Sequence, residues 1–549
     1  MASTASRASC RCSPTPACTT TGSCASAAPG GSRGATSRWT AARGRRRGAS
    51  EAHVSEDVVR KSATELAADV AGKRLSATEV TRAFLERITR LNSAVNAVCT
   101  VNPRALEDAA ECDRRLRAGE RPRPLEGVPF VVKDVIQTAA LRTTFGSTIH
   151  EHLVPGEDAV SVARLRAAGA VLLGKTNTPE FAHDVNTTNK IFGTTRNPWN
   201  LRTTAGGSSG GTGAALAADL APIGLGTDLG GSIRIPAAFC GISGIRPVPG
   251  RVPVYPTDFG WDTLVAHVHG PMARSVADLG LMLAVLAGPD DRDPSSLPAP
   301  AHDYATAAAG GRSVAGRRVA YTRDLNGLVP VDREVARLTR EAAGAFEGLG
   351  CVVEEDCFDV ADVREIIAGT RGFGMVARYA DRLETFRDQM TPQLINQVTD
   401  ALRLDVRAVT RAERLRTAYW QRVRAFLERY DYILTPTVGV PAFHIDRPLP
   451  SEVGGATVER FYDVFLTTYA FSVTGLPVAS VPCGFTAAGL PVGLQIVGRR
   501  LREDLVLEAA AAYALACPQH LARPPRIDPD AAREIRDAVV TTGFDISAR

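Results

Sequence analysis

The sequence predicts an α/β fold, a single large domain in which helices cover both faces of a mixed, twisted β-sheet. Segments with helical periodicity alternate with short apolar runs, and this alternation is typical of helices layered on a sheet. No internal repeat and no clean linker interrupts the chain after residue 54. Helices are expected at 76–92, 104–118, 158–168, 275–288, 333–348 and 504–516, and strands at 127–132, 170–173, 316–324, 350–356, 431–438, 477–485 and 491–498.

The two ends of the chain are expected to lie outside this domain. Residues 1–50 hold eight Arg, no acidic residue and no Leu, Ile, Val or Phe, so we expect 1–53 to form a disordered extension. Without these arginines, 56 basic residues face 59 acidic ones, and the net charge falls from +5 to −3. Nucleic-acid binding is therefore not expected. The domain is expected to span 54–530, with 531–549 as a tail.

Cysteine usage and hydropathy indicate the cellular location that we expect for the protein. No apolar run approaches the roughly 18 residues that a membrane helix needs, so no membrane partner is expected. Four of the eleven Cys fall within 1–50 at a spacing that fits no zinc motif, and the other seven are scattered. The nine His and the Cys form no metal-ligand cluster. We expect reduced thiols, a cytoplasmic location, no metal and no cofactor.

The first elements of the domain lead to a lysine. Ser76 and Glu79 form a capping box at the start of the first helix, and the apolar strand GVPFVV ends at Lys133. The chain has only five Lys against 59 Arg, a composition that would supply Arg for a generic positive charge. Lys133 therefore indicates a group that can lose its proton, which Arg cannot. A solvated lysine at the end of a strand is the alternative.

The segment after helix 158–168 matches the sequence pattern of a phosphate-binding loop. Gly169 to Thr176 fits the pattern G-x-x-x-x-G-K-T. Its four interior residues are Ala, Val, Leu and Leu, which predict a buried strand, and Pro179 follows before a helix can form. We therefore reject nucleotide binding.

Two serines lie in glycine-rich nests within the stretch 204–241. Ser208 stands in GGSSGG and Ser232 in DLGGSIR, 24 residues apart, with the helix-forming AALAADLA and the apolar IGLG between them. Small residues around a serine leave backbone N–H groups open to an anion. The stretch predicts a nucleophile with an oxyanion hole of neighbouring amides rather than a flexible Gly/Ser loop.

The rest of the chain completes the layers. The helix at 275–288 is strongly apolar and is expected to be buried. Residues 360–430 are mostly helical and are expected to form a cap over a cleft, and three apolar strands and the helix at 504–516 follow.

These motifs resemble the amidase signature family over residues 55–525. The resemblance rests on the order of the motifs and on the interval of 99 residues from Lys133 to Ser232. It implies the amidase signature fold and a Ser–cisSer–Lys triad, in which Ser232 is the nucleophile, Ser208 sits on a cis peptide bond and bridges, and Lys133 is the base. The motifs are GVPFVVKD, GKTNTPEF, FGTTRNPW, AGGSSGGTGAALAA, GLGTDLGGSIRIPAAFCGISG, GPMARSVAD and GLPVGLQIVG.

The resemblance also implies roles for residues around the triad. Asp228 and Arg234 are expected to brace the turn before Ser232, and Thr227 to form a hydrogen bond within it. The amides of the oxyanion hole are expected to be those of Leu229, Gly230, Gly231 and Ser232. Ala182 and His183 stand where family members line the acyl pocket, and Trp261 lies in a loop near it, although packing roles stay open for all three.

A lysine base needs a lowered pKa. Free Lys has a pKa near ~10.4, so a base that works near neutral pH needs a shift of about 3 units, or roughly 4 kcal/mol. Burial supplies such a shift because it penalises the charged form.

The expected function is hydrolysis of a small carboxylic amide through a serine acyl-enzyme. The alternative within the family is the glutaminase (A) subunit of a tRNA-dependent amidotransferase complex. That subunit usually carries a KPTYGRVS-like segment, whereas this chain reads RPVPGRVPVYP, and Ser472 stands where many members have Asn. A small-molecule amide is the expected partner, and a homodimer is the assembly considered.

Two other classes of function have weaker support in the sequence. Ser208 and Ser209 both fit the G-x-S-x-G motif of Ser-His-Asp hydrolases. Such a hydrolase also needs a histidine in a recognisable sequence context, and none of the histidines of this chain lies in one. A non-enzymatic binding protein would require loss of the triad, and no triad position is lost.

Overall fold

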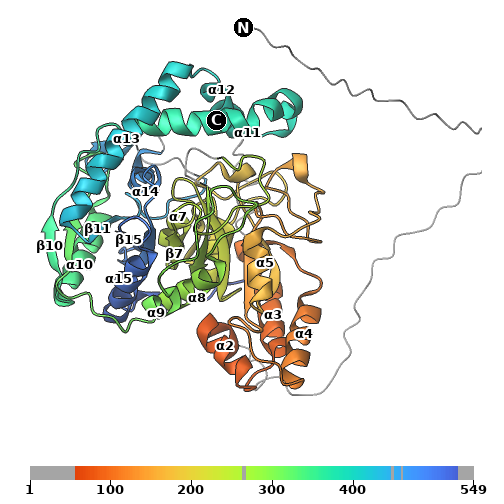
Figure 1. The fold of residues 1–549 in the computed structure, drawn as a ribbon. Helices are drawn as coiled ribbons and strands as arrows, with labels where there is room; N and C mark the ends of the chain where they lie inside the picture. Colours follow the sequence, from red (N-terminus) through yellow and green to blue (C-terminus); the bar gives the residue numbers. More distant parts are fainter. Residues whose placement is uncertain (1–55, 262–266, 447–450, 459–461, 530–549) are drawn as a thin grey trace, which may run out of the picture. The chain divides into compact units, whose positions relative to one another are not determined.

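An eleven-stranded mixed sheet forms the centre of the fold (Figure 1). The computed structural model describes residues 56–261, 267–446, 451–458 and 462–529, so the predicted extension at 1–53 and the tail at 531–549 lie outside the described residues. The strand order is β1-β3-β2-β6-β8-β7-β14-β15-β11-β9-β10. In chain order the strands are β1 (Val98–Val101), β2 (Pro129–Lys133), β3 (Val171–Thr176), β6 (Ile223–Asp228), β7 (Ser243–Arg246), β8 (Val268–Ala273), β9 (Arg318–Tyr321), β10 (Val352–Glu355), β11 (Tyr432–Pro436), β14 (Val478–Phe485) and β15 (Pro491–Val497).

The helices largely follow the predicted segments. Ser76 and Glu79 form the capping box of α3, with the Ser76 hydroxyl accepting from the Glu79 N–H. The helices are α2 (Ala63–Ala71), α3 (Ala77–Val95), α4 (Ala105–Arg117), α5 (Val160–Ala167), α6 (Gly210–Ala217), α7 (Arg234–Cys240), α8 (Val276–Leu286), α9 (Tyr304–Ala308), α10 (Arg333–Gly348), α11 (Val363–Phe386), α12 (Pro392–Ala401), α13 (Val406–Arg429), α14 (Leu466–Ser472) and α15 (Glu503–Ala516).

Helices pack on both faces of the sheet, as predicted. Successive side chains of a strand point to opposite faces, and β11 shows the two environments. Tyr432 and Leu434 lie in one core with residues of α10 and α15, whereas Ile433 lies in another with residues of α13 and α14. The fold is therefore an α/β fold with a mixed, doubly covered sheet.

Pairing gives the sheet its mixed character. Strand β2 runs parallel to both β3 and β6, and β9 runs parallel to β10 and β11. Antiparallel pairs join β6 to β8, β8 to β7, β7 to β14 and β14 to β15. The carboxyl ends of β2 and β6 consequently meet at one edge of the sheet.

Residues 363–429 form the helices α11, α12 and α13, in the region where a mostly helical cap was predicted. These three helices lie together, in teal in Figure 1. Met375 and Tyr379 of α11 and Leu394 of α12 pack against Phe181, which precedes the first serine nest in the chain. The cap helices therefore contact the loops around the candidate site.

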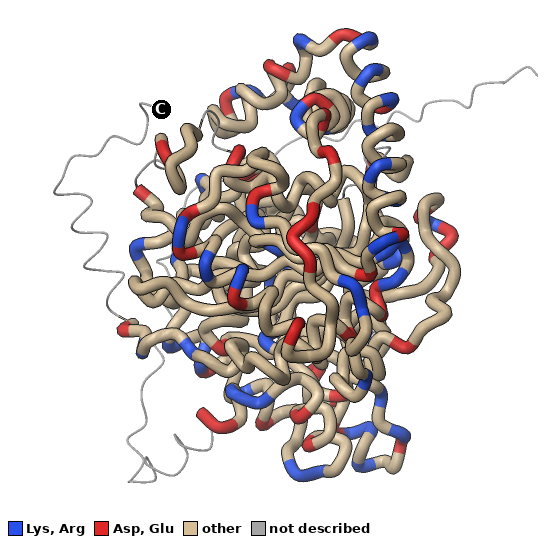
Figure 2. Tube along the Cα trace, turned by 90° about the vertical axis from the view of Figure 1, so that its left-hand side faces the viewer, with Lys and Arg blue, Asp and Glu red and all other residues tan. Residues whose placement is uncertain are grey.

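Basic and acidic residues are intermixed along the described chain (Figure 2). Several pairs follow helical spacing, such as Arg337 with Glu341. None of the helices within the described ranges combines the length and hydropathy of a membrane span. The described cysteines, seven in all, carry no disulfide.

Candidate active site

Lys133, the last residue of β2, is completely buried and contacts two hydroxyls. Its Nζ lies 2.6 Å from Ser208 Oγ and 2.8 Å from Thr227 Oγ1. Ser208 lies just before α6, and Thr227 lies near the end of β6, the parallel neighbour of β2. The fold thus joins the strand-end lysine to the first serine nest. The Thr227 hydroxyl contacts the lysine instead of bonding within its own turn.

Burial sets the protonation of Lys133. Desolvation lowers the pKa of the ammonium group well below its ordinary value, and attraction to the Asp228 carboxylate opposes this effect only in part. Among the described residues, no carboxylate lies within ion-pair distance of Nζ. A neutral amine carries a lone pair, so Lys133 can take a proton from a hydroxyl 2.6 Å away.

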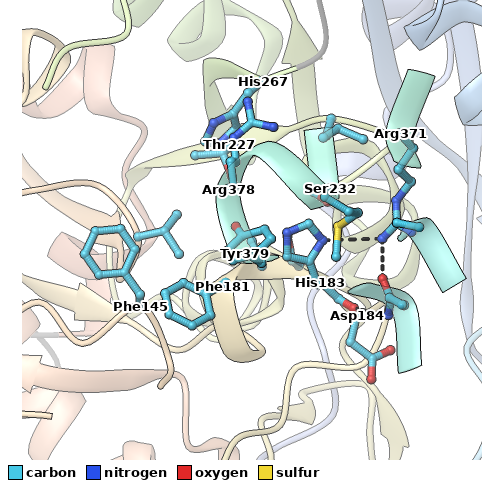
Figure 3. A pocket seen from close by; sticks show the side chains of 18 of the residues that line it. Phe145, Phe181, His183, Asp184, Thr227, Ser232, His267, Arg371, Arg378 and Tyr379 are labelled. Atoms are coloured by element: carbon cyan, nitrogen blue, oxygen red, sulfur yellow. Dashed lines mark hydrogen bonds between the residues drawn. The ribbon is translucent and has the colours of Figure 1, made fainter. Parts of the chain in front are cut away.

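Ser232 opens onto a cavity of about 970 Å³. Ser232 precedes α7 and lines this cavity together with Ser208, while Lys133 does not reach the cavity wall. The Ser209 N–H donates to the Ser232 carbonyl at 3.1 Å, which ties the two nests together. The Gly207–Ser208 peptide bond is cis. Figure 3 shows Ser232 among the side chains that line the cavity.

Asp228 holds the turn that carries Ser232. Its carboxylate accepts from the N–H groups of Gly231 at 2.7 Å and Ile233 at 3.2 Å. It also accepts from Arg234 Nε and Nη2, both at 3.0 Å. Burial raises the pKa of Asp228, but Arg234 and the other donors outweigh burial and lower this pKa to about 2. The carboxylate therefore stays charged and fixes the turn.

Two glycines of this turn have no room for a side chain. Gly231 has a φ of +122°, and a Cβ there would lie 2.4 Å from Thr468 Oγ1. A Cβ on Gly230 would lie 2.2 Å from the Tyr469 ring. The structure differs from expectation at Gly231, because its N–H is engaged by Asp228. The hydrogen bonds among the described residues leave the N–H groups of Leu229, Gly230 and Ser232 free for an oxyanion.

Asp228→Asn is expected to lower the free energy of unfolding by about 3–5 kcal/mol at pH 7, because a buried guanidinium loses its charge partner. The folded pKa of Asp228 lies below the unfolded value near ~3.9, so its contribution is present above about pH 4 and is lost as the pH falls toward about 2. Urea denaturation of both proteins at several pH values measures this. Equal stability at pH 7 would contradict the bracing role.

His183 and Ala182 lie in the cavity wall, where the resemblance placed them. Arg371 of α11 donates from Nη2 to His183 Nδ1 at 3.3 Å and to Gln397 Oε1 at 2.6 Å (Figure 3). Because a guanidinium only donates, Nδ1 of His183 accepts and Nε2 carries the ring hydrogen. Trp261 does not line the cavity and is 74% exposed.

Aromatic rings form one side of the cavity. The centroids of Phe145 and Phe181 lie 6.2 Å apart, those of Phe181 and Tyr379 lie 5.3 Å apart, and those of His183 and Tyr379 lie 4.9 Å apart. Figure 3 shows these rings in a row from Phe145 through Phe181 and Tyr379 to His183, with Ser232 on the side of His183. This wall suits a flat apolar group within the cavity that Ser232 also lines.

His267 and His269 line the cavity on another side. Strand β8 pairs His269 with Thr227 of β6. Burial, with smaller effects of neighbouring cations, lowers the pKa of each imidazole to about 3, so both are neutral at neutral pH. No hydrogen bond in the described part of the chain joins either ring to Ser232. The residues that the structure describes therefore do not place a hydrogen-bonded histidine of the Ser-His-Asp type at Ser232.

The family assignment agrees with this arrangement of residues. The Amidase family model matches residues 79–507, most of the chain. The chain belongs to the amidase family. An acylamidase of Rhodococcus erythropolis is 39% identical over 459 residues, which cover 82% of this chain and 94% of that protein. A glutamyl-tRNA(Gln) amidotransferase subunit of Geobacter metallireducens is 36% identical, covering 82% of this chain and 95% of that protein.

A bacterial aryl acylamidase of the amidase signature family has a similar structure. It superposes with a TM-score of 0.79 and 30% identity, covering 85% of this chain and all of that one. The amidase signature fold predicted from the motifs is thus confirmed.

Two residues that hold Arg234 were not predicted. Arg234 donates from Nη1 to Gln495 Oε1 and from Nη2 to Ser472 Oγ, both at 2.7 Å. Gln495 is fully buried inside β15 and lies in the motif GLPVGLQIVG. A polar residue within an otherwise apolar strand was the signal for a buried partner. Ser472, the last residue of α14, accepts the hydrogen bond from Arg234 with its hydroxyl.

Proposed function

We propose that this amidase hydrolyses carboxylic amides with Ser232 as nucleophile, Ser208 as bridge and Lys133 as base. The observation that carries the proposal is the buried contact of 2.6 Å between Lys133 Nζ and Ser208 Oγ, beside a cavity that Ser232 also lines. A serine hydroxyl becomes a competent nucleophile when a base takes its proton. A lysine whose pKa is lowered by burial supplies that base.

In the first half of the reaction, Ser232 Oγ attacks the amide carbon and its proton passes through Ser208 to Lys133. The carbonyl oxygen gains the negative charge and accepts from the free amides of Leu229, Gly230 and Ser232. Each such donor contributes about 3–4 kcal/mol in other hydrolases. The tetrahedral intermediate then collapses, the C–N bond breaks, and the proton held by Lys133 returns to the leaving nitrogen.

In the second half, water attacks the acyl-enzyme by the same route. Lys133 takes the proton of the water through Ser208, the C–O bond to Ser232 breaks, and Ser232 regains its proton. The products are a carboxylic acid and ammonia or an amine, and the step needs no cofactor or metal.

The substrate that we propose is an amide with an apolar or aromatic group. The aromatic wall of Phe145, Phe181 and Tyr379 supports this choice, as do the names of the acylamidase and aryl acylamidase relatives. The glutaminase subunit is the second candidate because glutamyl-tRNA(Gln) amidotransferase subunits are also among the relatives. The segment RPVPGRVPVYP, which departs from the pattern of that subunit, favours a stand-alone amidase.

Assays on the purified chain separate these two candidates. We expect kcat/KM for anilides and aromatic amides to exceed that for glutamine by about tenfold or more, because the apolar wall discriminates by size and polarity. Amine and ammonia release are measured for a panel of amides, esters, hydrazides and glutamine. If glutamine were the one substrate of the panel that is hydrolysed, and only after partner subunits are added, the amidotransferase assignment would be favoured.

The unpaired thiols support a cytoplasmic enzyme. The quaternary structure proposed is a homodimer, which sedimentation analysis tests.

A further inference from the structure

His269, a residue outside the proposed triad, lines the same cavity and has a buried hydrogen-bond partner. Ser161, in the first turn of α5, is completely buried, and its Oγ lies 2.9 Å from His269 Nδ1. Within the described ranges this is the only hydrogen bond of the Ser161 hydroxyl. A buried O–H requires an acceptor, so Nδ1 of His269 accepts from Ser161. The single proton of the neutral imidazole is therefore on Nε2.

This arrangement leaves an N–H donor for a ligand. His269 lines the cavity, and its Nε2 has no hydrogen-bond partner among the described residues. His267 packs against it with ring centroids 6.0 Å apart and an interplanar angle of 80°. Figure 3 shows His267 beside Thr227 and Arg378, at the cavity. A neutral imidazole offers a directed hydrogen bond and no net charge.

His267 and His269 lie outside the hydrogen bonds of the proposed triad. His269 lies opposite Thr227 on the neighbouring strand, close to the buried Lys133, and among the described residues neither histidine is hydrogen-bonded to Ser208 or Ser232. The cavity, at about 970 Å³, is large enough for a drug-sized molecule. A simple aliphatic amide would leave most of it unfilled.

We propose that His267 and His269 form a subsite that binds an oxygen acceptor of the substrate other than the carbonyl of the scissile amide. The substrate class is an amide whose bulky group carries an uncharged oxygen, such as a ketone or a second carbonyl. This inference rests on the amidase function proposed above. A site built to donate a hydrogen bond discriminates against analogues that lack the acceptor.

The test compares substrates that differ only in the acceptor. The pairs are 4-acetyl- and 4-isopropylacetanilide on the amine side, and 4-acetyl- and 4-isopropylbenzamide on the acyl side. For each variant, the kcat/KM of the acetyl member is divided by that of the isopropyl member. This ratio removes any loss of activity that affects both substrates equally. His269→Leu is expected to lower this ratio about tenfold or more in one of the pairs.

Three further variants sharpen the result. His269→Gln carries an amide N–H near the position of Nε2 and is expected to retain most of the ratio. Ser161→Ala removes the hydrogen bond that keeps the proton of His269 on Nε2, so the acetyl-to-isopropyl ratio is expected to lie between those of wild type and His269→Leu. His302→Leu removes a histidine that is 42% exposed and does not line the cavity, and it is the matched control that keeps the ratio unchanged.

Binding measurements make the test independent of turnover. Both members of each pair are titrated into Ser232→Ala protein with and without His269→Leu, and the Kd of an acetyl member is expected to rise about tenfold. Equal changes for acetyl and isopropyl members, in turnover and in binding, would overturn the subsite and leave His269 as a positioning residue for Thr227. If the Ser232→Ala protein discriminates in binding while the wild-type protein hydrolyses none of the four amides, the proposed function is contradicted instead. Where His269→Leu does not fold, His267→Phe and Ser161→Ala provide the same comparison.

Discussion

Replacing Ser232 with Ala is expected to abolish acyl-enzyme formation while the fold stays intact. Loss of a serine nucleophile lowers kcat on the order of 10⁶-fold in other hydrolases. The Ser232 hydroxyl faces the cavity and makes no hydrogen bond with the described residues, so its removal costs no buried contact. Turnover of an anilide, covalent labelling by a fluorophosphonate probe and the melting temperature are measured for both proteins.

The same experiment separates the roles of the two serines. Ser208→Ala is the matched variant, because it shortens the neighbouring serine by the same atom and removes the contact with Lys133. Labelling of Ser208→Ala protein is expected to be slow but still to occur at Ser232, which peptide mapping identifies. Labelling at Ser208 in the Ser232→Ala protein would show that the two serines have the opposite roles.

The elements that the sequence predicted are those with local signals. The capping box of Ser76 and Glu79 and the amphipathic stripe of α3 lie within a few residues of one another. Strands β6 (IGLGTD) and β8 (VHGPMA) were not predicted, because glycine and proline are typical of turns. Their extended state depends on pairing with β2 and with each other, and this pairing is a tertiary effect.

The same distinction applies to the site. Lys133, Ser208 and Ser232 were singled out from composition and glycine nests, which are visible in single segments. The contact of Arg371 with His183 joins residues 188 positions apart, and Gln495 reaches Arg234 across 261 positions. The place of His269 beside Thr227 depends on the register of β6 and β8. No local pattern encodes these relations, so the three candidate triad residues could be singled out from the sequence, whereas these long-range contacts could not.

Lys133→Arg is expected to be nearly as damaging as Lys133→Ala, each lowering kcat/KM by about 10²–10⁴-fold. Arg keeps the positive charge but cannot release its proton near neutral pH. A structural lysine that pairs with a charge would behave in the opposite way, with Arg restoring activity. The kcat/KM of both variants for an anilide distinguishes these two roles, with Lys61→Arg, at a lysine that pairs with Asp69 away from the cavity, as the control. Rescue by Arg would contradict a lysine base.

The pH dependence gives the second test of Lys133. Burial lowers its folded pKa well below the unfolded value near ~10.4, so the neutral, active form persists down to that lowered pKa. The acidic limb of kcat/KM is expected to fall as the pH drops through it. Between the two pKa values the unfolded chain binds more protons, so wild-type stability rises with pH, and Lys133→Met is expected to flatten this rise. Both effects come from one buried amine, and because His267 and His269 are neutral down to about pH 3, neither accounts for the limb. An unchanged acidic limb in the residual activity of Lys133→Arg would assign the titrating base to another group.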